Sequence, residues 1–147
     1  MSIIKAIQKN HFDAKVKRGW DKTYWAIDIH GTILEPNYEA NNIPDKFYSY
    51  AMPCLQELSN RDDVCLILYT CSHPHEIAEY IELFRKNWIN FDYINENPEI
   101  KTEEQGYGCY DKKFYFNVLF EDKAGFDPEK DWEEIFNFLK NKDNGVI

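Results

Sequence analysis

The chain has 147 residues, of which 44% are hydrophobic and 16% aromatic, and its formal net charge at pH 7 is -9. This composition predicts one folded domain with a sizeable core and excludes a disordered chain. The negative charge argues against tight nucleic-acid binding, and no apolar run approaches the about 20 residues of a membrane helix. The N-terminus lacks a secretory pattern and the four cysteines form no CxxC pair, so we expect reduced thiols and a cytoplasmic protein.

Helical and strand patterns alternate along the chain. Apolar residues at helical spacing predict helices over 2–17 and 51–60, a third capped by Ser72 or His73, and a last one opening at Asp127-Pro128. The third helix is expected to turn four residues inward: Ile77, Ile81, Phe84 and Trp88. Short apolar runs predict strands over 24–29, 64–69, 91–94 and 116–120.

The strand candidates are apolar almost throughout, which is typical of a sheet that is covered on both faces. We therefore predict an α/β fold: a three-layer, Rossmann-like, mostly parallel sheet with helices on both faces. The whole chain, 1–147, is expected to form one domain. Within it, 1–22 is interpreted as an N-terminal helical extension, 34–50 as a loop or small flap, and 141–147 as a frayed tail.

Three of the strand candidates end in residues that can carry chemistry. The first ends in Asp28, the second is followed by Thr70, and the fourth is followed by Glu121 and Asp122. Because parallel strands bring their carboxyl ends to one edge of a sheet, these side chains are expected to meet there. Carboxylates at such an edge suit a hard divalent cation such as Mg²⁺, which leaves positions open for water and phosphate.

These residues resemble the motifs of the haloacid dehalogenase superfamily, in its small phosphatases with little or no cap. DIHGT at 28–32 is similar to the first motif, usually Asp-x-Asp-Gly-Thr, and Thr70 resembles the hydroxyl of the second. Lys113 resembles the lysine of the third motif. Glu121-Asp122, with Asp127 beyond, resembles the acidic fourth motif. The resemblance covers about residues 23–140.

The resemblance implies a phosphate monoester hydrolase. Asp28 would be the nucleophile that forms an aspartyl-phosphate, and Thr70 would bind the phosphoryl oxygens together with backbone groups near Cys71. Lys113 would neutralise negative charge.

The resemblance also implies the metal ligands. Asp28, Asp122 and the backbone carbonyl of His30 would hold Mg²⁺, with Glu121 and Asp127 as further acidic candidates.

His30 stands where phosphatases of this superfamily carry a second Asp, which serves as general acid and base. Three interpretations stay open: His30 performs this proton transfer, the enzyme is slow or restricted to good leaving groups, or the pocket is catalytically silent. A silent pocket would make the protein a module that binds phosphate, metal or a protein partner.

Plainer interpretations exist for each site residue. Asp28 could form a turn, Thr70 could satisfy local backbone, and Glu121 could be an exposed acid. Lys112 could replace Lys113 as the functional cation. Asp127 precedes a proline and is well suited to cap a helix, which we favour over a metal role.

A zinc site and an aromatic flap are further alternatives. Cys71, His73 and His75 lie within five residues, although this spacing is not a common structural zinc pattern and Cys109 is distant in sequence. The segment 34–50 carries aromatic residues that could cover the site and select the substrate: Tyr38, Phe47, Tyr48 and Tyr50.

The sequence therefore predicts a cytoplasmic, Mg²⁺-dependent phosphatase that acts on a phosphorylated substrate of unknown identity. The short stretch between the first two strands leaves no room for a large cap domain. An open site would admit bulky substrates or would be closed by a neighbouring subunit in a homo-oligomer. A phosphatase acting on nucleic-acid ends is a third hypothesis, which the net charge disfavours.

Overall fold

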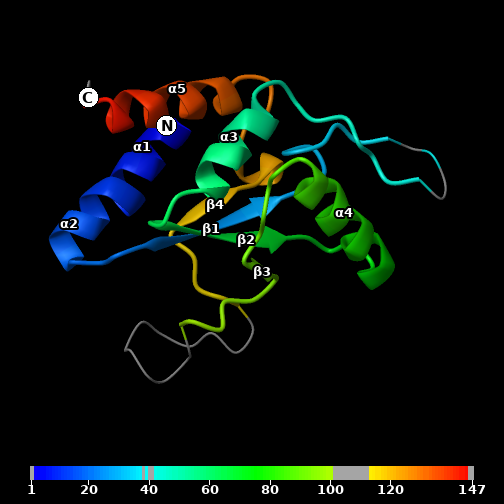
Figure 1. Ribbon diagram of the computed structural model, residues 1–147, viewed down its shortest axis with the longest axis horizontal. Coiled ribbons are helices and arrows are strands. Elements are labelled where there is room, and N and C mark those ends of the chain that lie inside the picture. Colours follow the sequence, from blue (N-terminus) through cyan, green and yellow to red (C-terminus); the bar gives the residue numbers. More distant parts are fainter. Residues whose placement is uncertain (1, 38, 40–41, 101–112, 146–147) are drawn as a thin grey trace.

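A parallel sheet forms the centre of the computed structural model, which describes residues 2–37, 39, 42–100 and 113–145. Its described strands are β1 (Thr23–Asp28), β2 (Val64–Tyr69), β3 (Tyr93–Ile94) and β4 (Val118–Phe120). They pair in the order β3-β2-β1-β4, with every pairing parallel (Figure 1). The predicted α/β, Rossmann-like fold is confirmed.

The register of the sheet aligns the strand ends that carry the predicted site. Asp28 at the end of β1 pairs with Tyr69 at the end of β2, and Ile27 pairs with Phe120 at the end of β4. The residues that follow these strands therefore emerge side by side at the carboxyl edge. This is the edge at which open α/β sheets bind ligands.

The N-terminal helix is one continuous rod with a π-helical centre. It runs through α1 (Ile3–Ile7), η1 (Gln8–Asp13) and α2 (Ala14–Arg18), as predicted for 2–17. Ser2 caps its start, because its Oγ accepts a hydrogen bond from Lys5 N–H. Ile7 is fully buried in the main core, so this helix is an integral part of the domain.

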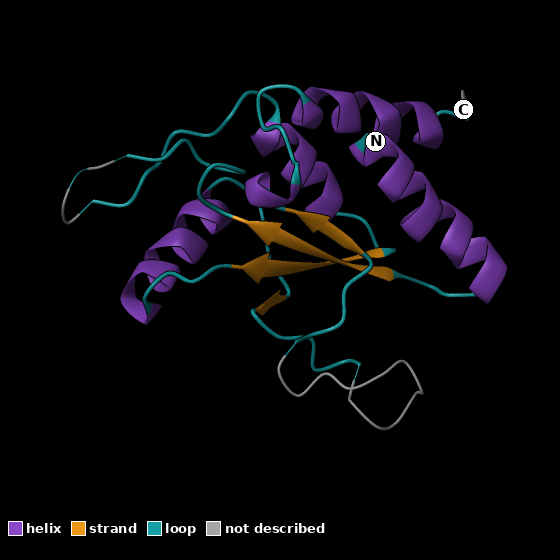
Figure 2. Cartoon of the chain, turned by 180° about the vertical axis from the view of Figure 1, so that it is seen from behind, coloured by secondary structure: helices purple, strands orange, loops and turns teal. Residues whose placement is uncertain are grey.

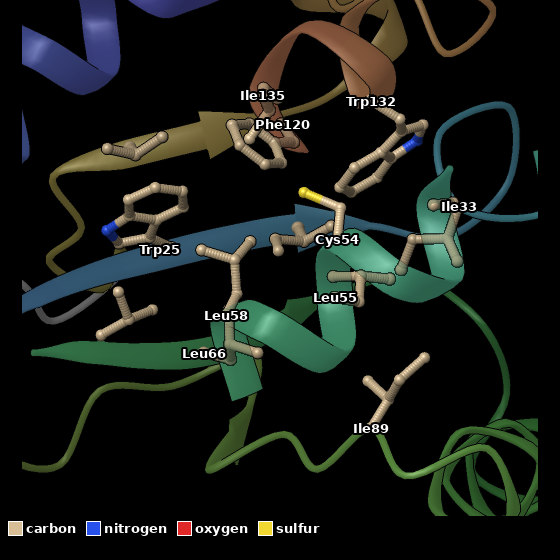
Figure 3. Close-up of a cluster of buried hydrophobic side chains, with 14 of the residues drawn as sticks. Trp25, Ile33, Cys54, Leu55, Leu58, Leu66, Ile89, Phe120, Trp132 and Ile135 are labelled. Carbon is tan, nitrogen blue, oxygen red and sulfur yellow. The ribbon is translucent and has the colours of Figure 1, made fainter. Parts of the chain in front are cut away.

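Helices cover one face of the sheet and enclose the main hydrophobic core. Beside the N-terminal rod they are α3 (Ala51–Ser59), α4 (Pro74–Lys86) and α5 (Asp131–Asp143). Figure 2 shows the rod, α3 and α5 on the same side of the strands. In the core, Trp25 and Phe120 of the sheet pack near Leu58 of α3 and Trp132 of α5 (Figure 3). Burial of these large side chains fixes the positions of β1 and β4 relative to each other.

A smaller cluster covers the opposite face. Tyr24, Cys65 and Ile67 point to this side, in alternation with the residues of the main core. Within the described part of the chain, they are covered by partly buried residues at β3 and in the irregular segments between β3 and β4: Tyr93, Ile100, Phe114 and Tyr115. Figure 1 shows these segments below the sheet, opposite α3 and α5.

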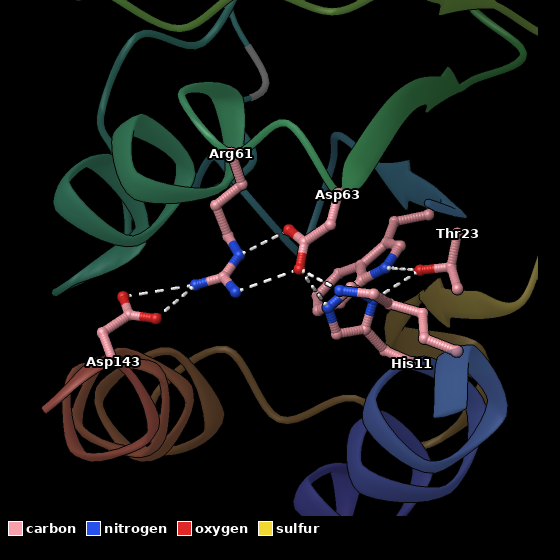
Figure 4. Close-up of polar contacts among 7 residues, drawn as sticks. His11, Thr23, Arg61, Asp63 and Asp143 are labelled. Carbon is pink, nitrogen blue, oxygen red and sulfur yellow. Dashed lines mark hydrogen bonds and ion pairs between the residues drawn. The ribbon is translucent and has the colours of Figure 1, made fainter. Parts of the chain in front are cut away.

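A polar network fastens the N-terminal rod to the amino end of the sheet (Figure 4). The fully buried His11 makes hydrogen bonds through Nδ1 to Thr23 Oγ1 at 2.6 Å and through Nε2 to Asp63 Oδ2 at 3.1 Å. Lys15 and Arg61 also bind Asp63, and Arg61 continues to Asp143 of α5. These partners hold the pKa of Asp63 well below its usual range, against the opposing effect of its burial.

The third helix ends before Trp88, which corrects the expected inward position of this residue. The helix stops at Lys86, and Trp88 adopts a left-handed φ of 62° with its side chain 77% exposed. Ile89 N–H donates to Phe84 O and Trp88 N–H to Arg85 O, which is the Schellman pattern of a helix C-terminus.

Two further details differ from the sequence prediction. The last helix begins at Asp131, after a turn over 127–130, and continues to Asp143, so the start of the expected frayed tail is helical. The ends of the 34–50 loop are hydrogen-bonded to each other: Glu35 N–H donates to Lys46 O, and Tyr48 N–H to Ile33 O. None of the described helices has both the length and the apolar character needed to cross a membrane.

Candidate active site

Three carboxylates converge at the carboxyl edge of the sheet. Asp28 ends β1, whereas Glu121 and Asp122 follow β4 directly, and one oxygen of each lies within 4.8 Å of the others. Among the described residues this is the one cluster of at least three acidic, His or Cys side chains with such spacing. An all-oxygen donor set of this kind fits a hard divalent cation such as Mg²⁺.

The environment of Asp28 disfavours its charged form. Burial raises the pKa of this carboxyl to about 6, and the negative charges of Glu121 and Asp122 add to the effect. Hydrogen bonds from the Ile29 backbone and the Thr32 hydroxyl act in the opposite direction. The cluster is therefore electrostatically strained in the absence of a cation, and a bound cation would relieve the strain.

Thr32 connects the two strand ends. Its buried hydroxyl donates to Asp28 Oδ2 at 3.2 Å and accepts from Asp122 N–H at 3.2 Å, while its carbonyl accepts from Trp132 Nε1–H at 2.7 Å. One hydroxyl thus bridges Asp28 and the backbone of Asp122, in addition to the pairing of β1 with β4. In the sequence, Thr32 is distinguished only as part of the DIHGT motif. Thr32 lies in the turn after β1, where strand periodicity gives no signal for its burial.

Gly31 permits the close approach of the two strand ends. Its φ is +74°, a left-handed conformation, and a Cβ built on it would lie 2.7 Å from Asp122 Oδ2. The positive φ favours glycine, and any Cβ here would have to displace the exposed Asp122 carboxylate from its position in the cluster.

Thr70 is held at the end of β2 in the same cavity. Asn95 receives a hydrogen bond from Thr70 N–H at 2.8 Å and donates to Thr70 O at 2.7 Å. The Thr70 hydroxyl lies 2.8 Å from Ser72 Oγ and accepts from Ser72 N–H. These contacts fix the backbone of Thr70 before α4 begins.

His30 contacts a tyrosine that the sequence analysis did not single out. Its Nε2 lies 2.6 Å from the hydroxyl of Tyr80, a residue of α4 that is 1% exposed. Burial raises the pKa of Tyr80 to about 12, so the phenol stays protonated at neutral pH.

An open cavity of about 580 Å³ joins these groups. Its lining includes Lys123, which follows Asp122 in the short 3-10 helix Asp122–Ala124. The full lining is Asp28, His30, Gly31, Pro36, Tyr69, Thr70, Cys71, Glu121, Asp122 and Lys123. The structure therefore brings together six of the predicted site residues, Asp28, His30, Thr70, Cys71, Glu121 and Asp122, and adds one lysine.

Two predicted site residues lie elsewhere. Lys113 is exposed and does not line this cavity. Asp127 is outside the carboxylate cluster, and its Oδ1 accepts a hydrogen bond from Glu129 N–H in the turn before α5. Asp127 therefore stabilises that turn, although the helix itself begins later than predicted.

The zinc alternative is not supported within the described part of the chain. His73 and His75 stack with ring centroids 5.8 Å apart, but with Cys71 they do not form a metal-ligating group. Lys112 and Cys109 lie outside the described residues.

The aromatic residues proposed for a flap have several positions. Phe47 and Tyr48 pack against the main core, and Tyr50 is 41% exposed. Tyr38 lies outside the described residues. Pro36 is the residue of this segment that lines the cavity.

Comparison with known proteins supports the fold. No family model matches the chain, and no curated protein matches it. Among solved structures, a conserved protein coded by a locus of Bacteroides thetaiotaomicron is similar, with 26% sequence identity and a TM-score of 0.61. The match covers 82% of this chain and 92% of that chain, so the likeness extends over most of both chains.

Proposed function

We propose that the protein is a Mg²⁺-dependent phosphate monoester hydrolase that acts through an aspartyl-phosphate on Asp28. The observation that carries this proposal is the convergence of Asp28, Glu121 and Asp122 at one sheet edge, with Thr70 in the same cavity. The DIHGT motif and the order of the other motifs along the chain agree with it. A phosphorylated substrate supplies the negative charge that such a cation site attracts.

Asp28, Glu121 and Asp122 would hold the cation, which when bound would neutralise the carboxylates and the phosphoryl oxygens. The oxygen of Asp28 attacks phosphorus, and the bond from phosphorus to the substrate oxygen breaks. A carboxylate with a pKa of about 6 is mainly ionised at neutral pH, so Asp28 is available as the nucleophile.

The polar groups of the cavity would position the phosphoryl group. The Thr70 hydroxyl donates to a phosphoryl oxygen, and the adjacent start of α4 adds backbone N–H groups. Lys123 is the cavity-lining lysine among the described residues, and we assign it the charge-neutralising role for which the sequence analysis named Lys113. Electrostatic positioning of this kind supplies most of the catalysis in phosphoryl transfer.

His30 would give a proton to the leaving oxygen and then take one from the water that hydrolyses the aspartyl-phosphate. Proton transfer by a positioned side chain contributes about 10²–10⁴-fold. His30 is one of the residues that line the cavity with the three carboxylates.

The test is hydrolysis of para-nitrophenyl phosphate with and without Mg²⁺. We expect Mg²⁺-dependent turnover that is lost in Asp28→Asn and reduced in Thr70→Val. Asp62→Asn is the matched control, because Asp62 is an exposed acid outside the cavity lining. Turnover that survives in Asp28→Asn would refute the mechanism.

A phosphate-binding module without turnover is the second candidate, and the presence of His30 at the position of the usual acid favours it. Beryllium fluoride, a mimic of the phosphoryl group, tests whether Asp28 is competent with Mg²⁺, and turnover then separates an enzyme from a module that is silent at His30. An enzyme takes it up and turns over para-nitrophenyl phosphate. A silent module fails to turn over, and activity gained in His30→Asp would locate the defect at this residue.

A further inference from the structure

The contact between His30 and Tyr80 is built from a buried residue and an exposed one. Tyr80 is 1% exposed, and its ring stacks on Phe84 with centroids 6.4 Å apart and an interplanar angle of 20°. The imidazole of His30 meets the Tyr80 ring edge-on at 80°, with centroids 5.4 Å apart. The buried phenol therefore holds the exposed imidazole in one position.

We propose that Tyr80 is a positioning residue that engages Nε2 of His30 and leaves Nδ1 as the nitrogen that exchanges protons with the substrate. This inference rests on the proposed function and assigns the atom through which His30 acts. The 2.6 Å distance between Nε2 and the Tyr80 hydroxyl carries it. The hydrogen bonds of the described residues include none to Nδ1.

A tyrosine hydroxyl suits this task because it can both donate and accept a hydrogen bond. It pairs with Nε2 whether or not that nitrogen carries a proton, so the contact persists through the reaction. A histidine has two ring nitrogens and a rotatable ring, and an external partner selects which nitrogen reacts. In the catalytic triad the same selection is made by a carboxylate.

The proton balance of the two steps follows from this assignment. His30 enters the first step with a proton on both ring nitrogens. As an Asp28 oxygen bonds to phosphorus, the Nδ1–H proton moves to the leaving oxygen, which keeps the electron pair of the broken bond to phosphorus. The ring is then neutral and keeps its Nε2–H, which donates to the Tyr80 oxygen. In the second step Nδ1 takes a proton from water as the water oxygen attacks phosphorus. The Asp28 carboxylate is then released with inorganic phosphate, and Nδ1 again carries its proton.

Tyr80→Phe is the decisive variant, since it keeps the ring and its stack on Phe84 and removes only the hydroxyl. Two substrates are compared: para-nitrophenyl phosphate, whose good leaving group needs little acid assistance, and phenyl phosphate, whose leaving group is poorer. We expect kcat for phenyl phosphate to fall about tenfold, with KM unchanged and para-nitrophenyl phosphate affected by less than about twofold.

Two controls isolate the effect. Tyr93→Phe removes a different tyrosine hydroxyl, which donates to Glu99 on the opposite face, and should leave both rates unchanged. In a His30→Ala background, Tyr80→Phe should cause no additional loss, because its target is then absent. Equal losses on both substrates, or an additional loss in His30→Ala, would show that Tyr80 has a merely structural role.

A measurement on the metal-free protein checks the contact without activity. The ¹⁵N resonances of the His30 ring are compared between wild type and Tyr80→Phe, and we expect the Nε2 resonance to move more than Nδ1. Unchanged ring resonances would overturn the inference. Absence of Asp28-dependent turnover in the wild type overturns the proposed function and this inference with it, whereas turnover without the phenyl phosphate defect overturns this inference alone.

Discussion

Neutralising the nucleophile should stabilise the metal-free protein at neutral pH. The change is Asp28→Asn, which keeps the size of the side chain and an oxygen that accepts the Thr32 hydroxyl hydrogen bond. Burial and the neighbouring carboxylates raise the pKa of Asp28 from 3.8 to about 6, so the folded state resists its ionisation. Asp28→Asn carries no charge, so the folded variant does not bear the free-energy cost of ionising this side chain.

The magnitude follows from the pKa. At about 1.36 kcal/mol per pKa unit, a rise from 3.8 to about 6 sets an upper bound of about 3 kcal/mol. Because Asp28 is only partly buried and solvent screens its charge, we expect about 1–2 kcal/mol.

The sign of the pH dependence is fixed by linkage. Between pH 4 and 6 the folded wild type binds more protons than the unfolded chain, so its free energy of unfolding falls as pH rises through this window. The advantage of Asp28→Asn should therefore be absent below about pH 4 and complete above about pH 6, the pKa given for the folded state.

Urea denaturation of both proteins in EDTA, at pH 4 and pH 7.5, measures this difference. Glu121→Gln is the comparison variant. It removes the neighbouring charge that contributes most to the raised pKa of Asp28, and it should give a smaller gain in stability with the same pH dependence. A gain of equal size at both pH values would refute the electrostatic reasoning. A loss of stability at pH 7.5 would show that the carboxylate makes favourable contacts that outweigh its burial.

Three further substitutions test the framework around the site. Gly31→Ala should destabilise the protein by about 1–3 kcal/mol and abolish Mg²⁺ binding, because its Cβ would lie 2.7 Å from Asp122 Oδ2. Calorimetry measures the binding, and unaltered Mg²⁺ affinity would contradict the close approach of Gly31 to Asp122. Thr32→Val should lower the free energy of unfolding in urea by about 1–3 kcal/mol and weaken Mg²⁺ binding, because it leaves Asp122 N–H without its hydrogen-bond partner. An unchanged Mg²⁺ affinity would show that Thr32 does not support the cation site. Asp63→Asn should lower the free energy of unfolding by about 2–4 kcal/mol at pH 7. This loss should shrink as pH falls toward 2, since hydrogen-bonded and charged partners lower the pKa of the Asp63 carboxyl. A loss that does not depend on pH would show that the charge of Asp63 is not involved.

Most of the fold could be predicted because apolar runs and turn signals are local properties of the sequence. The six-residue strand Val64–Tyr69 was predicted to the residue, since five consecutive buried positions leave no alternation to misinterpret. The end of α4 could not be predicted in this way. Trp88 occupies the left-handed position after the helix, where glycine is usual, so its apolar character suggested a continuing inner face.

The residues of the candidate site also divide into those that local sequence signals identify and those that only the folded structure reveals. Asp28, Thr70 and Asp122 were identified because each stands at or directly after an apolar strand, and parallel pairing brings strand ends together. Tyr80 was missed because its partner is fifty positions away in sequence and the inward face of the helix was assigned from Ile77, Ile81, Phe84 and Trp88. Lys123 was missed because only the short 3-10 helix after β4 brings it to the cavity.

Trp132 of α5 donates a hydrogen bond to the Thr32 carbonyl, and the Thr32 hydroxyl bridges Asp28 and Asp122. The packing of α5 and the geometry of the carboxylates are therefore thermodynamically linked. A ligand that draws Asp28 and Asp122 together also favours the arrangement of Thr32 that Trp132 holds in place. By reciprocity, whatever loosens α5 weakens binding at the sheet edge, and binding makes local opening of the helix less favourable. Amide hydrogen exchange along α5 would then report occupancy of a site that lies outside the helix itself.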